Sequence, residues 1–172
     1  ASIPLAIGNR RPVKRLGPLS AADLVIVQSQ RSRGQYLSAG MNPDRVRLIP
    51  GFAELPLSFP ETVQRSSWVF MGRLTEEKGV AQLLEIWPQG ESLDVIGAGS
   101  ELARLKGSAP QGVRFLGPLP HADVLHRLPT YLGLVFPGLC WEGGIPLVVQ
   151  EALSHGVPVI AAADTAAHDI VE

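Results

Sequence analysis

Short apolar runs alternate along the chain with stretches in which apolar residues recur at helical spacing. The apolar runs, rich in β-branched side chains, predict strands at Leu24–Gln28, Val46–Ile49, Trp68–Gly72, Leu93–Ile96, Val113–Leu116, Leu132–Phe136 and Val157–Ala161. The stretches between them predict helices near Arg31–Ser38, Gly79–Trp87, Ser100–Lys106, Ala122–Leu128 and Pro146–His155. Continuously apolar strands separated by short helices are typical of a parallel sheet covered on both faces. The sequence therefore predicts an α/β fold with a doubly wound parallel sheet.

The alternation stops at residues 50–65, a stretch with three prolines and no clear period. Two predicted strands and one helix precede this stretch, and a longer run of strand and helix units follows it. We therefore expect residues 1–60 to be the tail of one domain with its linker, and residues 61–172 to form a Rossmann-like domain. The chain opens at Ala1 without an initiator Met or a signal-peptide pattern, and we expect it to be a piece of a longer protein.

Composition excludes several classes of protein. A net charge of -1 over 172 residues argues against a broad nucleic-acid surface, and no apolar run approaches the roughly 18 residues of a membrane span. The basic cluster Arg10, Arg11, Lys14 and Arg15 either faces an anionic membrane or is solvated. The single cysteine, Cys140, fits a small buried residue better than a nucleophile and suits a reducing compartment. We expect a cytoplasmic protein, located at the inner membrane surface if the basic cluster binds lipid.

Two cations follow the third predicted strand. Thr75 is a suitable N-cap for the next helix, which would place Lys78 in the first helical turn and Arg73 on the loop before it. A helix N-terminus carries partial positive charge, so a cation there is disfavoured by about 0.3–1 kcal/mol unless an anion binds nearby. Converging cations and free N–H groups favour a phosphate site. The alternative is that the two glutamates between the cations neutralise both on a solvated turn.

Glycines follow the next predicted strands, at the edge where open parallel sheets bind ligands. Gly97 and Gly99 permit a tight turn with close backbone approach, and we expect Ser100 to cap the helix after them. Leu102 occupies the third glycine position of the dinucleotide fingerprint, so an NAD site is not indicated. Gly117 ends the strand after that. A plain turn without a ligand is the alternative for these glycines.

Two carboxylates follow the sixth predicted strand. Glu142 lies in a loop with Gly143 and Gly144, and Glu151 lies on the polar stripe of the helix that follows. Both follow the strand end opposite the two cations, where the hydroxyls of a sugar would need acceptors. The alternative is that Glu151 is merely solvated.

Other chemistries lack their sequence signatures. The chain has no Asp-x-Asp pair, no two-histidine or Cys/His spacing for a metal, and no G-x-S-x-G nucleophile motif. The histidines are scattered at positions 121, 126, 155 and 168, and none has a partner that the sequence reveals. We expect His121 to begin a helix.

Six segments, in this order and spacing, resemble the retaining glycosyltransferases of the GT-B fold, and among them family 4. They are Ala22–Ser29, Arg45–Phe52, Phe70-x-Gly72-Arg73-Leu74-x-x-x-Lys78-Gly79, Asp94–Gly99, Val113–Gly117 and Glu151–Val159. The resemblance is mainly to the C-terminal, donor-binding domain of these enzymes. It implies a Rossmann-like donor domain preceded by a remnant of the acceptor domain.

The resemblance also implies roles for individual residues. Arg73 and Lys78 would hold the diphosphate of a nucleotide-sugar, and Glu151 would bind its ribose hydroxyls. Glu142 would lie near the reacting face of the sugar. Donor contacts are also implied for Gly72, Gly97, Gly99, Gly117, Gly143, Gly144 and Ile145, with the backbone around Gly117 beside the base. No metal and no cofactor are implied.

The implied reaction is retaining hexosyl transfer from a nucleoside diphosphate to an unknown acceptor, which is a glycan, a lipid-linked sugar or a small molecule. Such a fragment alone should bind nucleotide but be inactive, because the reacting centre lies between two domains. Glu142 and Glu151 are nine positions apart, where the family has eight. Either Gly143-Gly144 absorbs one residue in a bulge, or Glu142 is not the family's first glutamate. The alternative functions are a GT-B-fold epimerase or phosphorylase, or a non-catalytic nucleotide-binding module.

Overall fold

The computed structural model describes residues 17, 21–56, 63–138, 142–163, 165, 167 and 170. Its large unit, residues 63–170, is built on a five-stranded sheet in which all neighbouring strands are parallel. The strand order is β5-β4-β3-β6-β7, with β3 at Ser67–Met71, β4 at Leu93–Ile96, β5 at Val113–Gly117, β6 at Tyr131–Phe136 and β7 at Val159–Ala161. From β3 the chain builds outward to β5 and then returns to the other side of β3 with β6 and β7. The predicted doubly wound α/β fold is confirmed.

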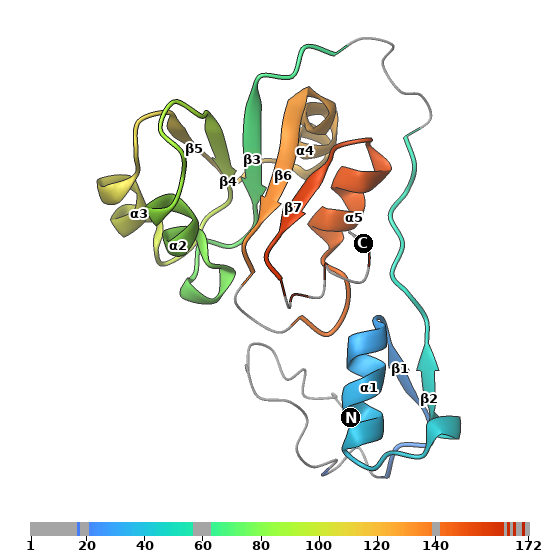
Figure 1. Ribbon diagram of the computed structural model, residues 1–172. Helices are drawn as coiled ribbons and strands as arrows, with labels where there is room; N and C mark the ends of the chain where they lie inside the picture. Colours follow the sequence, from blue (N-terminus) through green and yellow to red (C-terminus); the bar gives the residue numbers. More distant parts are fainter. Residues whose placement is uncertain are drawn as a thin grey trace.

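Helices cover both faces of this sheet (Figure 1). Alternate residues of β3 point to opposite faces: Phe70 packs with the helix pair α2 and α3, whereas Val69 and Met71 pack with α4 and α5. The helices span Val80–Glu85 (α2), Leu102–Ser108 (α3), His121–Arg127 (α4) and Leu147–Ser154 (α5), with 3₁₀ turns at Glu76–Lys78 and Leu128–Thr130. Burial on both faces explains why the strands are continuously apolar, since each fully buried Val, Leu or Phe contributes about 1.5–3 kcal/mol.

The small unit, residues 21–56, contains one βαβ arrangement. Its elements are β1 (Val25–Val27), α1 (Gln30–Ser38), a 3₁₀ turn (Pro43–Arg45) and β2 (Val46–Leu48), and the two strands are parallel. Ser29 caps α1 by accepting a hydrogen bond from the Ser32 N–H at 3.1 Å. Val27, Met41 and Val46 form a small separate core. In Figure 1 the small unit lies beyond the carboxyl ends of the central strands.

The seven predicted strands and five predicted helices are all present, with ends shifted by at most two residues. The expected N-cap Thr75 belongs to a 3₁₀ turn instead of α2, and the expected cap at Ser100 is wrong. Thr75 precedes the 3₁₀ turn that ends at Lys78, and Gly79, with a left-handed φ of 73°, separates this turn from α2. Lys78 therefore does not lie in the first turn of α2. Ser100 does not cap α3, because that helix begins at Leu102 with Glu101 at the cap position.

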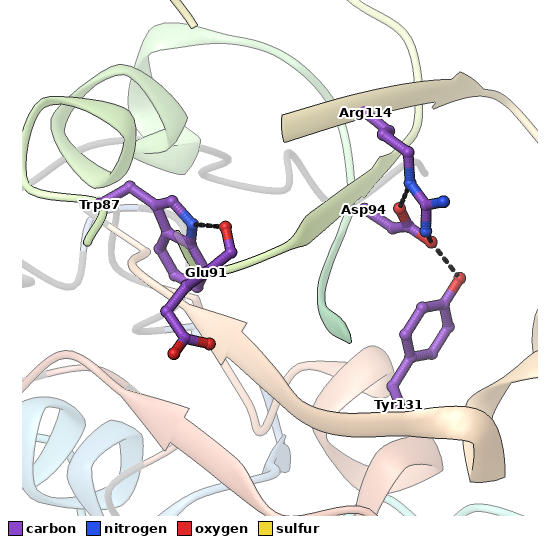
Figure 2. A network of polar contacts seen from close by, with 5 residues as sticks. All are labelled: Trp87, Glu91, Asp94, Arg114 and Tyr131. Atoms are coloured by element: carbon purple, nitrogen blue, oxygen red, sulfur yellow. Dashed lines mark hydrogen bonds and ion pairs between the residues drawn. The ribbon is translucent and has the colours of Figure 1, made fainter. Parts of the chain in front are cut away.

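A polar network joins three strands near the amino-terminal edge of the sheet (Figure 2). Arg114 donates to both carboxylate oxygens of Asp94, from Nε at 2.7 Å and from Nη2 at 3.0 Å, and the Tyr131 hydroxyl donates to Asp94 Oδ2 at 3.3 Å. Burial, together with the neighbouring Asp94 charge, raises the pKa of Tyr131. Figure 2 also shows Trp87 donating from Nε1 to the Glu91 carbonyl at 3.0 Å. The Asp94 carboxylate is buried, and these bonds offset the cost of removing it from water.

Several predicted features lie outside the described residues. These are Cys140, His168 and the basic cluster Arg10, Arg11, Lys14 and Arg15. Within the described ranges, no helix has the length and apolar character needed to cross a membrane.

Candidate functional site

The loop after β3 carries both predicted cations. Leu74, with 0% of its surface exposed, anchors this loop in the core. Its N–H donates to the Ala98 carbonyl at 2.9 Å, and its own carbonyl accepts from the Glu101 N–H at 2.9 Å. Because Leu74 is fixed on both sides by the loop after β4, Arg73 and Lys78 are presented at the carboxyl edge of the sheet from a well-supported backbone.

Arg73 and Lys78 line one cavity of about 230 Å³, here called the cation cavity. Gly72 contributes to the same wall, and Glu142 reaches the cavity from the loop after β6. The remaining lining residues are Phe70, Met71, Phe136, Pro146, Leu147 and Val148. Residues from two neighbouring strand ends thus meet in one hollow, as the sequence predicts for an open parallel sheet.

Each cation already has a carboxylate partner. Lys78 Nζ forms an ion pair with Glu142 Oε1, and their side chains are 16% and 23% exposed. Arg73, at 59% exposure, has Nη2 3.5 Å from Glu77 Oε1. The pKa of the Glu77 carboxyl is lowered, chiefly by a hydrogen bond from the backbone N–H of Glu77 itself. The alternative that neighbouring glutamates neutralise both cations therefore holds for Arg73, which pairs with Glu77. It does not hold for Lys78, whose described partner is Glu142 from a distant loop and not the exposed Glu76.

The small unit holds the loop that carries Glu142. Ser29 Oγ donates to Ser32 Oγ at 2.8 Å, and Ser32 Oγ donates to the Gly143 carbonyl. Ser29 and Ser32 are both buried. This chain of hydrogen bonds connects the first turn of α1 to the residue next to Glu142.

A second and larger space, here called the interunit cleft, lies between the small and large units. It has a volume of about 600 Å³ and shares Glu142, Pro146 and Leu147 with the cation cavity. Gly144 lies so close to Gln28 that an added Cβ would stand 2.4 Å from its Oε1. The other lining residues are Ile26, Ile49, Pro50, Gly51, Phe52, Gly143, Ile145 and Gln150.

Glu151 lies one helical turn from the cation cavity. It follows the cavity residue Leu147 by four positions on α5, and it is only 6% exposed. His121, at the start of α4, places Nε2 2.7 Å from Glu151 Oε1. The expectation that His121 begins a helix is confirmed, and the structure gives this histidine a partner that the sequence does not reveal. His155 also contacts Glu151, with Nδ1 2.9 Å from its backbone carbonyl.

The two glycines after β4, Gly97 and Gly99, have a packing role. A Cβ added to Gly97, whose φ is 144°, would lie 1.9 Å from the Gly72 carbonyl oxygen, and one added to Gly99 would lie 2.2 Å from that of Leu74. The Gly97 N–H donates to the Gly117 carbonyl at 2.9 Å. None of these three glycines lines either of the two spaces described. Gly97 and Gly99 allow the loops behind the cation cavity to pack backbone against backbone.

A sequence profile described as "Glycosyl transferases group 1" matches residues 65–172, well over half of the chain. The chain belongs to the glycosyl transferases group 1 family. A curated relative is the GDP-mannose-dependent monoacylated alpha-(1-6)-phosphatidylinositol monomannoside mannosyltransferase of Corynebacterium glutamicum. It is 32% identical over an alignment that covers 95% of this chain and 50% of the relative. The group 1 chain thus spans about half the length of this relative.

Solved structures support the same fold for this group 1 chain. HepE from Anabaena, in complex with UDP-glucose, superposes with a TM-score of 0.75 at 21% identity, covering 91% of this chain and 50% of HepE. Sucrose-phosphate synthase from Thermosynechococcus elongatus gives a TM-score of 0.66 at 27% identity, covering 86% of this chain and 42% of the synthase.

Some residues at the site of this group 1 protein are not predicted by its sequence. Ser32, Gln28 and Gln150 line or brace the loop of Glu142, and His121 pairs with Glu151. Ser32 follows the N-cap Ser29 by three positions, which indicates only a helix start. Its partner Gly143 is 111 residues away, so no local pattern could reveal the contact.

Proposed function

We propose that this chain forms the donor-binding part of a family 4 glycosyltransferase that transfers a hexosyl group from a nucleoside diphosphate, with retention and without a metal ion. The observation that carries the proposal is the cation cavity, where Arg73, Lys78 and Glu142 meet at the carboxyl edge of the sheet. Similar proteins support the donor class, since HepE was solved with UDP-glucose and the curated relative is named as GDP-mannose-dependent.

Binding of a diphosphate would proceed by exchange of partners. Lys78 is paired with Glu142, so a donor phosphate must replace that carboxylate at the Lys78 ammonium. The exchange would release Glu142 toward the sugar, which occupies the space beside Pro146 and Leu147 in this proposal. As the glycosidic bond breaks, negative charge grows on the departing diphosphate, and Lys78 and Arg73 stabilise it from fixed positions.

The proposal takes the remaining donor contacts from the resemblance to the family. Glu151 accepts hydrogen bonds from the ribose hydroxyls, and Gly143, Gly144 and Ile145 surround the sugar. The backbone around Gly117 lies beside the base. Gly97 and Gly99 act indirectly, because they let the loop after β4 support Leu74 and thereby the loop of the cations.

We place the acceptor in the interunit cleft, which adjoins the cation cavity at Glu142. On this proposal residues 1–60 are the tail of an acceptor domain, and the exposed side chains of Ile26, Ile49 and Phe52 favour an acceptor with an apolar part. The curated relative is named for a phosphatidylinositol-based acceptor. A lipid-linked acceptor would bring the basic cluster at residues 10–15 to an anionic membrane surface.

The binding test is a calorimetric titration of the 172-residue chain with UDP, GDP and ADP. One of these nucleotides should bind, and Arg73→Ala and Lys78→Ala should weaken it. Arg104→Ala is the matched control, because Arg104 forms an exposed ion pair with Glu101 away from the cavity. Equal affinities for the wild type and both cavity variants would contradict the proposed diphosphate site.

The reaction is tested with the full-length protein, a labelled nucleotide-sugar and EDTA. Transferred sugar that keeps its anomeric configuration, formed at an unchanged rate in EDTA, is the expected product. An epimerised donor would instead identify an epimerase, and a sugar phosphate would identify a phosphorylase. A melting temperature that no nucleotide raises would favour a non-catalytic module.

A further inference from the structure

The contact between His121 and Glu151 joins two segments that the fold brings together from 30 positions apart. His121 opens α4 after β5, Glu151 lies in α5 after β6, and both helices cover the same face of the sheet. The Glu151 side chain is 9% exposed, whereas that of His121 is 67% exposed. An exposed imidazole therefore contacts a carboxylate that is almost fully buried.

The chemistry of an ionised carboxylate sets the direction of this hydrogen bond. An ionised carboxylate can only accept, so the Nε2–H of His121 donates to Glu151 Oε1 in either charge state of the ring. Within the part of the chain that the structure describes, the hydrogen bond of the Glu151 carboxylate is the one at Oε1 with His121. Oε2 is the second acceptor atom of the same carboxylate.

We propose that His121 is a positioning residue that fixes the Glu151 carboxylate so that Oε2 receives a ribose hydroxyl of the donor. The inference rests on the proposed function and extends it to a residue that the diphosphate site does not include. A buried carboxylate without a fixed partner can rotate or take up a proton, and either change removes an aligned acceptor. His121 acts through Glu151 and determines how strongly the site prefers a nucleotide with ribose hydroxyls.

The test measures, for the wild type and each variant, the ratio of the affinity for a ribose-containing nucleotide to the affinity for its dideoxy counterpart. UDP, GDP and ADP are each titrated beside their 2′,3′-dideoxy counterparts, into the wild type, His121→Phe and His121→Gln. Phe keeps the ring without a donor, and the Gln amide donates from a similar distance. We expect His121→Phe to weaken binding of the ribose-containing nucleotide about tenfold, with the dideoxy nucleotide unchanged, and His121→Gln to restore the preference. His126→Ala on the same helix is the matched control, because His126 is exposed.

The inference is overturned if His121→Phe keeps the wild-type ratio, or if it weakens both nucleotides equally. A loss of affinity in Arg73→Ala and Lys78→Ala beside an unchanged ratio in His121→Phe would overturn this inference alone. Unchanged affinity in those two cavity variants would instead overturn the proposed diphosphate site. A measurement on the wild type needs no substitution: the imidazole ¹⁵N signals of His121 should shift with the ribose nucleotide and not with inorganic pyrophosphate. Equal shifts with both would contradict the role.

Discussion

The two edges of the central sheet use charge in opposite ways. At the amino-terminal edge, Asp94 has hydrogen bonds to both of its oxygens, from Arg114 on the neighbouring strand β5 and from Tyr131 on β6, two strands away. At the carboxyl-terminal edge, the Lys78–Glu142 pair joins two loops and lines a cavity. The first arrangement holds strands together, whereas the second keeps charges next to a space that a ligand can enter. Ion pairs of similar chemistry thus serve stability at one edge and, on our proposal, binding at the other.

The largest expected effect is that of Lys78→Ala on nucleotide binding. Loss of charge-assisted hydrogen bonds to a diphosphate should weaken binding by about 2.7 kcal/mol, roughly 100-fold. Arg73→Ala should cost less, because the Arg73 side chain is 59% exposed and more strongly screened by water. Calorimetric titration measures both values, and an effect of Arg73→Ala larger than that of Lys78→Ala would contradict this ranking.

Arg114→Ala tests the other edge. The substitution leaves Asp94 buried with Tyr131 as its described partner, so the free energy of unfolding should fall by about 2 kcal/mol. Urea unfolding measures the loss, and Arg104→Ala, which breaks an exposed pair, should change stability by less than about 0.5 kcal/mol. Nucleotide affinity should stay at the wild-type value. A loss of affinity as large as that of Lys78→Ala would break the distinction between the edges.

Glu142→Gln should strengthen nucleotide binding. The amide no longer competes with the diphosphate for Lys78, and a gain of about 1 kcal/mol, roughly fivefold, is expected. Transfer by the full-length protein should fall at the same time, because the carboxylate beside the sugar is lost. Glu77→Gln is the comparison variant, with a smaller gain expected at exposed Arg73. Weaker binding by Glu142→Gln would contradict the exchange of partners.

The smallest effect concerns the alkaline stability of the amino-terminal edge. Burial raises the pKa of Tyr131 above its ordinary value of 10.0, so its contribution is complete below pH 10 and is lost as pH rises through the higher folded-state value. Tyr131→Phe should lower stability at pH 8 by about 1 kcal/mol. Urea unfolding at pH 8 and pH 11 should show a smaller alkaline loss in Tyr131→Phe than in the wild type. Equal losses would show that Tyr131 does not titrate as part of this network.

The sequence predicts the sheet well because its signal is local. Strands buried on both faces must be apolar throughout, and Leu93–Ile96 is observed with the predicted bounds. The error at Lys78 is also local in origin. Thr75 followed by Glu76 and Glu77 has the composition of a helix start, but Gly79 adopts a left-handed conformation and ends the turn before α2 begins. Glycine is compatible with both left-handed and right-handed backbone conformations, so composition alone could not decide between a helix and a short turn.

The site is predicted less completely than the fold. Strand ends indicate where Arg73, Lys78 and Glu142 should gather, because parallel strands finish at one edge. The partner of each side chain is a tertiary property: Lys78 pairs with a residue 64 positions away, and Glu151 with His121. For Gly97 and Gly99 the spacing suggests a loop that contacts a ligand. In the structure both glycines pack closely against the backbone of a neighbouring loop.

The bond from Ser32 to the Gly143 carbonyl has a mechanical consequence. It crosses from the small unit to the residue adjoining Glu142, and Ser32 is 1% exposed, so water does not readily replace it. A rotation of α1 relative to the central strands must either break this bond or move the loop that contains Gly143. While this bond holds, the orientation of the small unit and the position of the Glu142 carboxylate therefore change together.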